Sequence, residues 1–183
     1  MKFKNLIIIS VLGIATIFSS CKKGADDPAF SFMSRDARIT ADWVLSSMNE
    51  TNVHVIKGGS STYTTTKTYV FDGTTMQYTS KDDFGTQTTS YPYSYEISIN
   101  KEGTYNETEV EDGEKTETTD YWFWANSDKN KIAVTFSGIG TYMINRLAKD
   151  ELVLTQATVS SHTDGDGNIT SDTNNISMTF SKK

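Results

Sequence analysis

The stretch Tyr91–Asn100, YPYSYEISIN, has the strictest residue pattern in the chain. Every second position is apolar or aromatic: Tyr91, Tyr93, Tyr95, Ile97 and Ile99. Successive side chains of a β-strand point to opposite faces of the sheet, so this period of two predicts a strand with one buried and one wet face.

Similar segments extend outward on both sides, and they are separated by turn signals such as Asp72-Gly73 and Lys101-Glu102-Gly103. Strands are predicted at residues 63–71, 75–80, 91–99, 104–110, 115–124, 132–136, 142–147, 152–160 and 176–180. A long sheet with short sequential connections tends to close, because closure removes its exposed edges. The sequence therefore predicts an all-β fold, an antiparallel up-and-down β-barrel of about 8–10 strands.

One segment before these strands has helical spacing. Phe32, Arg35, Asp36, Ile39 and Trp43 fall at three- and four-residue steps, which brings Phe32, Ile39 and Trp43 towards one side and predicts a short N-terminal helix within Phe30–Trp43. Ser34 or Ser31 is suited to cap it.

The first 21 residues have the layout of a bacterial lipoprotein signal peptide. Lys2 and Lys4 precede an apolar run over residues 6–18, and Ser19 and Ser20 then lead to Cys21, the only cysteine. The run is too short to cross a bilayer core, which needs roughly 20 residues; an uncleaved anchor is the alternative. We expect residues 1–20 to be removed and Cys21 to be lipidated, palmitate included, so that lipid holds the protein to the membrane.

The mature chain would be an acidic single domain. Removing 20 of 183 residues leaves 163, and removing Lys2 and Lys4 leaves 15 Lys and Arg against 23 Asp and Glu, a net charge of −8. Such a chain is a poor partner for nucleic acid. Residues 21–29 are expected to form the lipidated cysteine and a flexible tether, and residues 30–183 the domain. Lys22-Lys23 directly after the cysteine favours the periplasmic face of the outer membrane over the cell surface.

Three segments resemble a known group of proteins: PAFSFMSRDARITADWVL at Pro28–Leu45, YEISINKEGTYNET at Tyr95–Thr108 and TYMINRLAKDELVL at Thr141–Leu154. In these the chain is similar to the lipocalin-like domain lipoproteins of Bacteroidetes-type bacteria, although Ala41 stands where lipocalins favour glycine before the tryptophan. The resemblance implies an up-and-down barrel with a helix near one end. It implies a binding fold and no particular ligand.

The interior of such a barrel is either filled by side chains or holds one small molecule. Buried tyrosine hydroxyls need hydrogen-bond partners, which a ligand-filled lumen supplies. The candidate ligand-binding residues of the barrel interior are Tyr69, Phe71, Tyr91, Tyr93, Tyr95 and Phe136. We expect a small apolar or amphipathic ligand. The alternative is a structural or adaptor lipoprotein with a filled barrel, docking to another envelope component through an exposed Trp122/Trp124 patch.

Catalytic and metal-binding signals are weak. The turn at residues 164–168, DGDGN, imitates a calcium loop, but Ile169 and Asn175 stand where that loop needs Gly and Glu. His54 and His162 are the only histidines, and no carboxylate pair stands out among the acidic residues. We expect no enzyme activity, no metal and no cofactor. The acidic segment 102–120 is expected to be the solvated face of a hairpin, with a cation site as the alternative.

Overall fold

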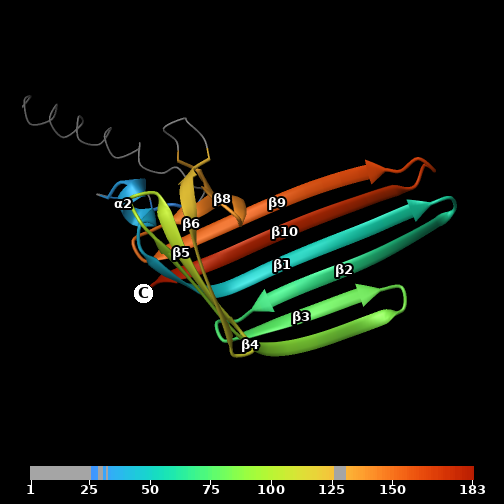
Figure 1. The fold of residues 1–183 in the computed structure, drawn as a ribbon, viewed down its shortest axis with the longest axis horizontal. Helices are drawn as coiled ribbons and strands as arrows, with labels where there is room; N and C mark the ends of the chain where they lie inside the picture. Colours follow the sequence, from blue (N-terminus) through green and yellow to red (C-terminus); the bar gives the residue numbers. More distant parts are fainter. Residues whose placement is uncertain (1–25, 29–30, 32, 126–130) are drawn as a thin grey trace, which may run out of the picture.

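Ten antiparallel strands form one sheet that closes into a ring, with one short helix at its end (Figure 1). The computed structural model describes residues 26–28, 31, 33–125 and 131–183, so the predicted signal peptide and Cys21 lie outside the described residues. The elements are α2 (Arg35–Ile39), β1 (Asp42–Gly58), β2 (Ser61–Phe71), β3 (Thr75–Asp82), β4 (Gly85–Ile99), β5 (Thr104–Glu111), β6 (Glu114–Trp124), β7 (Ala133–Phe136), β8 (Gly140–Leu147), β9 (Glu151–Thr163) and β10 (Ile169–Lys182). The prediction of an all-β antiparallel fold with a short helix is confirmed.

The ring has different widths at its two ends because β1 changes its partner. Near its start, β1 pairs with β4, so that Trp43 lies opposite Ile97. Farther along, from Met48 onward, β1 pairs with β2 instead. The β2–β3 hairpin is thus inserted between β1 and β4 at one end only. At the other end, β2 and β3 are not part of the ring, and the remaining eight of the ten strands close it.

The hydrophobic core fills this eight-stranded end. An eight-stranded ring is just wide enough for side chains to fill it. The fully buried side chains include Trp43, Phe71, Ile97, Tyr105, Val134, Phe136, Ile144, Leu147, Leu152, Leu154 and Phe180. Burial of each large apolar side chain contributes about 1.5–3 kcal/mol to stability. The chain holds a single cysteine, so this core supplies the stability without an internal disulfide.

Six strands continue beyond the core as a wall. β9, β10, β1, β2, β3 and β4 run side by side away from α2, while β5, β6 and β8 gather at the α2 end (Figure 1). We call residues 51–68, 79–90 and 157–173 the extended wall; none of them is buried. Threonine and other polar residues fill this wall because both of its faces meet water.

The predicted helix is shorter than expected, and several strands are longer. No range was predicted for β1, and β10 begins at Ile169 rather than at residue 176. α2 covers only Arg35–Ile39, with Ser34 as its N-cap accepting a hydrogen bond from the Ala37 amide at 3.1 Å. Trp43 belongs to β1, although its indole Nε1 still donates to the Ile39 carbonyl at 2.8 Å. β4 begins at Gly85 rather than at the predicted Tyr91. The sequence pattern did not reveal this earlier start, because residues 85–90 are exposed on both faces and carry no hydrophobic alternation. In the described part of the chain, no helix has the length and hydropathy needed to cross a bilayer.

Two residues of the predicted tether contact the sheet and the helix. The Asp26 amide donates to the Asn145 carbonyl of β8 at 2.9 Å, and the Arg146 guanidinium donates to the Asp26 carbonyl at 2.8 Å. Asp27 is buried, accepts a hydrogen bond from the Leu147 amide at 2.7 Å, and forms an ion pair with Arg35 of α2. Asp26 and Asp27 are therefore attached to the domain.

Candidate binding site on the inner wall

A ladder of tyrosines and glutamates lines the inner wall directly above the core. Tyr95, Tyr93 and Tyr91 of β4 are partly buried against core side chains, and they step from the core towards the rim. Each tyrosine has a neighbouring glutamate on β5. Tyr93 Oη donates to Glu109 Oε1 at 2.7 Å, while Glu107 is the neighbour of Tyr95 and Glu111 that of Tyr91. We call these six residues the tyrosine–glutamate ladder.

Burial changes the proton affinity of this ladder. Loss of water raises the pKa of Tyr93 and Tyr95 far above the ordinary tyrosine value, and the neighbouring glutamates add to this effect. Burial also raises the pKa of Glu107, and the hydrogen bond from Tyr95 offsets only part of the rise. The inner wall thus holds neutral phenols next to Glu107, whose carboxylate is costly to keep charged because it is partly buried.

The tyrosines of the predicted site lie together on this wall. Tyr69 of β2 contacts Tyr78 of β3 with ring centroids 4.9 Å apart, and Tyr91 contacts Tyr93 edge-on at 6.5 Å. Tyr69, Tyr91, Tyr93 and Tyr95 all pack against the core from the open side. These aromatic rings give the inner wall a surface suited to an apolar or ring-shaped part of a ligand.

The two phenylalanines of the predicted site lie deeper. Phe71 and Phe136 are each only 2 % exposed, and their rings meet Tyr93 and Tyr105 edge-on at 5.4 Å and 5.2 Å. They are core residues in contact with protein side chains. The sequence could not show that these two residues are buried more deeply than the tyrosines. The alternation of apolar and polar residues is the same for residues in the core and for residues near the rim.

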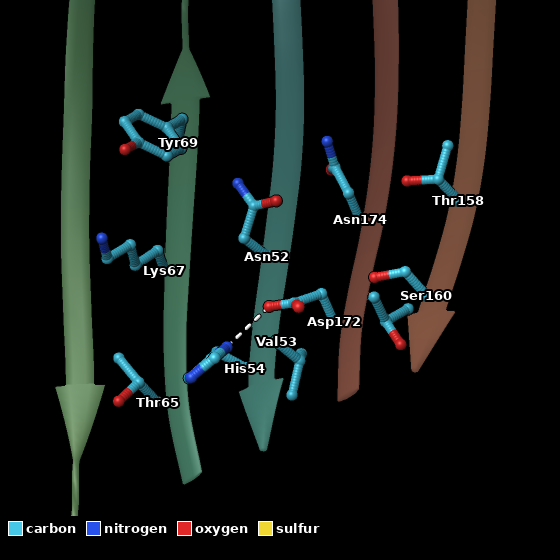
Figure 2. A pocket seen from close by; sticks show the side chains of 11 residues that line it. Asn52, Val53, His54, Thr65, Lys67, Tyr69, Thr158, Ser160, Asp172 and Asn174 are labelled. Atoms are coloured by element: carbon cyan, nitrogen blue, oxygen red, sulfur yellow. Dashed lines mark hydrogen bonds and ion pairs between the residues drawn. The ribbon is translucent and has the colours of Figure 1, made fainter. Parts of the chain in front are cut away.

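A groove of about 350 Å3 continues from Tyr69 along the extended wall, across β2, β1, β10 and β9 (Figure 2). Its lining is polar: Asn52, Val53, His54, Thr65, Lys67, Tyr69, Thr158, Ser160, Asp172, Thr173 and Asn174. His54 Nδ1 lies 2.6 Å from Asp172 Oδ1, which fixes the orientation of the imidazole. The Asn174 Oδ1 atom is shielded from solvent, yet it has no hydrogen-bond partner in the described structure.

Most of these groove residues were missed by sequence reasoning. The sequence distinguishes His54 only as one of two histidines. The polar residues carry no periodic signal because both faces of the extended wall are polar. Their grouping depends on the pairing of β1 with β10, which places Asp172 opposite His54 although 118 residues separate them.

The aromatic cluster Tyr121–Trp124 is oriented differently from the expected exposed tryptophan patch. Trp122 is buried, and its Nε1 donates to the Asn100 carbonyl at 2.7 Å. Trp124 is partly buried and donates to Asp36 Oδ1 at 2.8 Å. Tyr121 and Phe123 are the exposed members, so the docking patch expected at the tryptophans is not present there.

The turn that imitates a calcium loop is a hairpin turn between β9 and β10. The Asp164 carboxylate accepts hydrogen bonds from the Asp166 amide at 3.0 Å and from the Asn168 amide at 2.9 Å. These bonds and the Asn168 side chain lower the pKa of Asp164. Among the described residues, no group of three or more His, Cys, Asp or Glu side chains is arranged to hold a metal ion.

The inner wall combines two chemistries within one surface. The tyrosine–glutamate ladder offers aromatic faces, and the groove beyond Tyr69 offers hydroxyl, amide and ammonium groups. In comparisons with known proteins, no family model matches the chain, and neither a curated protein nor a solved structure matches it.

Proposed function

We propose that this chain is a lipid-anchored envelope protein whose domain binds one small amphipathic molecule on its inner wall. In this proposal residues 1–20 are a removed signal peptide, and Cys21 carries the lipid that holds the protein on the periplasmic face of the outer membrane. The closed ring with a helix at one end is of lipocalin-like barrel architecture. The residue pattern Lys2–Cys21 supports the anchor, and the closed antiparallel ring supports the architecture.

The observation that carries the binding proposal is the groove that continues from Tyr69 across β2, β1, β10 and β9. Its lining presents hydroxyl, amide and ammonium groups, among them those of Ser160, Asn52 and Lys67. The groove therefore offers hydrogen-bond partners for the polar end of a ligand, while Tyr69 and the ladder offer aromatic contact for its apolar end.

An amphipathic ligand fits this surface better than a purely apolar one. The apolar end of the interior is filled by core side chains, with Phe71 and Phe136 among them. The groove beyond it is lined mainly by polar groups, whose burial under an apolar molecule would cost free energy. The ligand is thus expected to place hydroxyl or amide groups over β1 and β10.

Native mass spectrometry of the mature lipoprotein, purified from its own envelope in mild detergent, tests the proposal. The wild type should retain a bound small mass. Asn174→Ala should lose most of that mass, because it removes a polar side chain that lines the groove. Asn175→Ala is the matched control, since Asn175 points to the opposite face of the same strand and should keep it. An empty wild-type spectrum, or equal occupancy in both variants, would contradict the proposal.

The filled core end favours the adaptor function as a second candidate. Eight strands close tightly around the core, which leaves the outside of that end as the surface available to a partner. A protein that co-purifies in stoichiometric amount with a ligand-free wild type would support this candidate over ligand binding.

A further inference from the structure

Three exposed apolar side chains lie on the outer surface of the core end. Tyr121 and Phe123 of β6 are 66 % and 55 % exposed, and Met143 of β8 is 48 % exposed. β6 and β8 flank β7, where Ala133 pairs with Met143 and Thr135 pairs with Phe123. We call Tyr121, Phe123 and Met143 the outer patch. Thr135 and Thr141 lie on the same face between Phe123 and Met143, so the patch consists of exposed apolar side chains around two threonines. Exposed apolar side chains bordered by polar residues favour contact with a partner surface.

The described chain begins next to this patch. Asp26 is bonded through its amide to the Asn145 carbonyl, two residues along β8 from Met143. Four residues, 22–25, lie between Cys21 and Asp26, so five residue steps connect them. A chain advances at most about 3.6 Å per residue, so Cys21 lies no more than about 18 Å from this attachment, whatever conformation those residues adopt.

We propose that the outer patch rests on the bilayer to which Cys21 is anchored. This inference depends on the lipid anchor of the proposed function. A lipidated Cys21 fixes one point at the membrane surface, and the short connection keeps the β8 side of the domain close to it. Tyr side chains favour the interfacial region of a bilayer, where the apolar ring is buried and the hydroxyl stays wet. Phe and Met side chains on a surface that lies on the bilayer are buried at its acyl boundary.

The charge distribution agrees with contact through apolar groups. The mature chain is acidic, so anionic lipid surfaces do not attract it as a whole. The acidic turn of the β5–β6 hairpin, with Glu111, Asp112 and Glu114, lies at the opposite end of β6 from Phe123. Docking through the outer patch therefore keeps these carboxylates away from the lipid headgroups.

Membrane contact at this end sets the direction of the extended wall. The wall runs away from α2 and β8, which lie at the anchored end (Figure 1). The groove on its inner face would be held out in the aqueous compartment, open to a ligand arriving from solution.

Spin labelling of the lipidated protein in phosphatidylethanolamine–phosphatidylglycerol vesicles tests this orientation. The chain has one cysteine, and its sulfur is consumed by the lipid, so an introduced cysteine is the only free thiol. Met143→Cys places a label in the outer patch. Val159→Cys is the matched control on the extended wall, where the side chain is 77 % exposed. Collision with a water-soluble nickel chelate should be several-fold lower at position 143 than at position 159.

A second pair of samples separates the patch from the anchor. Adding Tyr121→Ser and Phe123→Ser to Met143→Cys should raise nickel accessibility to the level of position 159, while the protein still floats with vesicles. If the label at 143 is as accessible as that at 159 in protein that floats, the docking proposal is overturned and the anchor stands. If the lipoprotein does not float at all, the anchor itself fails and this inference fails with it.

Discussion

Asp27 shows how one buried side chain joins three parts of the fold. Its carboxylate forms an ion pair with Arg35 of α2 and accepts a hydrogen bond from the Leu147 amide of β8. The segment before the helix, the helix and the sheet are thus all in contact with this one carboxylate. Both side chains of the pair are almost fully buried. Such a pair is costly to break, because the remaining charge has no compensation.

Asp27→Ala should therefore lower the free energy of unfolding by about 3–5 kcal/mol. Urea denaturation monitored by tryptophan fluorescence measures this change. Asp26→Ala is the control: Asp26 is exposed and bonds through its backbone, so it should stay close to wild type. Equal stability of the two variants would show that the pair with Arg35 is not needed.

Glu107 gives the ladder a pH dependence. Its pKa in the folded state is raised by burial, so the unfolded chain releases this proton at lower pH than the folded one. The stabilising contribution is full below the ordinary glutamate pKa and is lost as pH rises through the folded value. Glu107→Gln should thus be more stable than wild type at pH 7, with a smaller difference at pH 4.

Thermal unfolding at several pH values measures this difference. Glu102→Gln, in the exposed β4–β5 turn, should not reproduce the gain. A Glu107→Gln protein that is less stable than wild type at pH 7 would mean that the charged carboxylate supports the tyrosines of β4.

Residue patterns alone predicted part of this arrangement. The alternation Tyr91–Ile99 correctly placed its tyrosines on one face with the core isoleucines. It could not tell the depth of each residue, so Phe71 and Phe136 were grouped with residues that line the open wall. It also could not place glutamates opposite the tyrosines, because that needs the register of β4 against β5.

The β5–β6 hairpin turns at two residues with left-handed backbone. Asp112 and Gly113 have φ of 48° and 88°, as a type I′ turn requires. Such turns match the twist of the flanking strands, which explains why the Asp-Gly signal was readable from the sequence.

Gly113→Ala should lower stability by about 1–2 kcal/mol, because an L-residue with a side chain is strained at this φ. Gly165→Ala is the control, since Gly165 is in a turn without left-handed φ and has open space around it. Chemical denaturation of both variants checks this prediction, and equal losses would rule out backbone strain as the cause.

Elements with two wet faces were the least predictable. The first residues of β4 and much of β1 have no hydrophobic period, so their extent follows from pairing with neighbours and not from local pattern. The prediction for α2 has the opposite error, because it made the helix too long. Ile39 and Trp43 have helical spacing and are both buried, but Ile39 ends α2 and Trp43 lies in β1. Two buried residues on either side of the helix end therefore imitated one helical face.

At the scale of the whole molecule, the filled end and the extended wall should differ in local stability. The core end excludes water, while the wall holds its strands mainly by backbone hydrogen bonds. Regions with few buried apolar contacts open more easily.

Hydrogen exchange should show this gradient within single strands. Amides at residues 157–163 of β9 should exchange at least about tenfold faster than those at residues 152–154, which lie in the core. Mass spectrometry with fragmentation along the backbone resolves the two segments. Uniform protection along β9 would show that the sheet opens as one unit.

The pairing of β1 with β10 has a consequence for biosynthesis. The two strands lie at opposite ends of the domain sequence, yet Trp43 pairs with Lys182 and Lys57 with Ile169. During synthesis, β1 cannot pair with β10 until the residues of β10 have left the ribosome. Pairing between strands so far apart in the sequence is slow. The ring of strands therefore closes only after β10 has been synthesised.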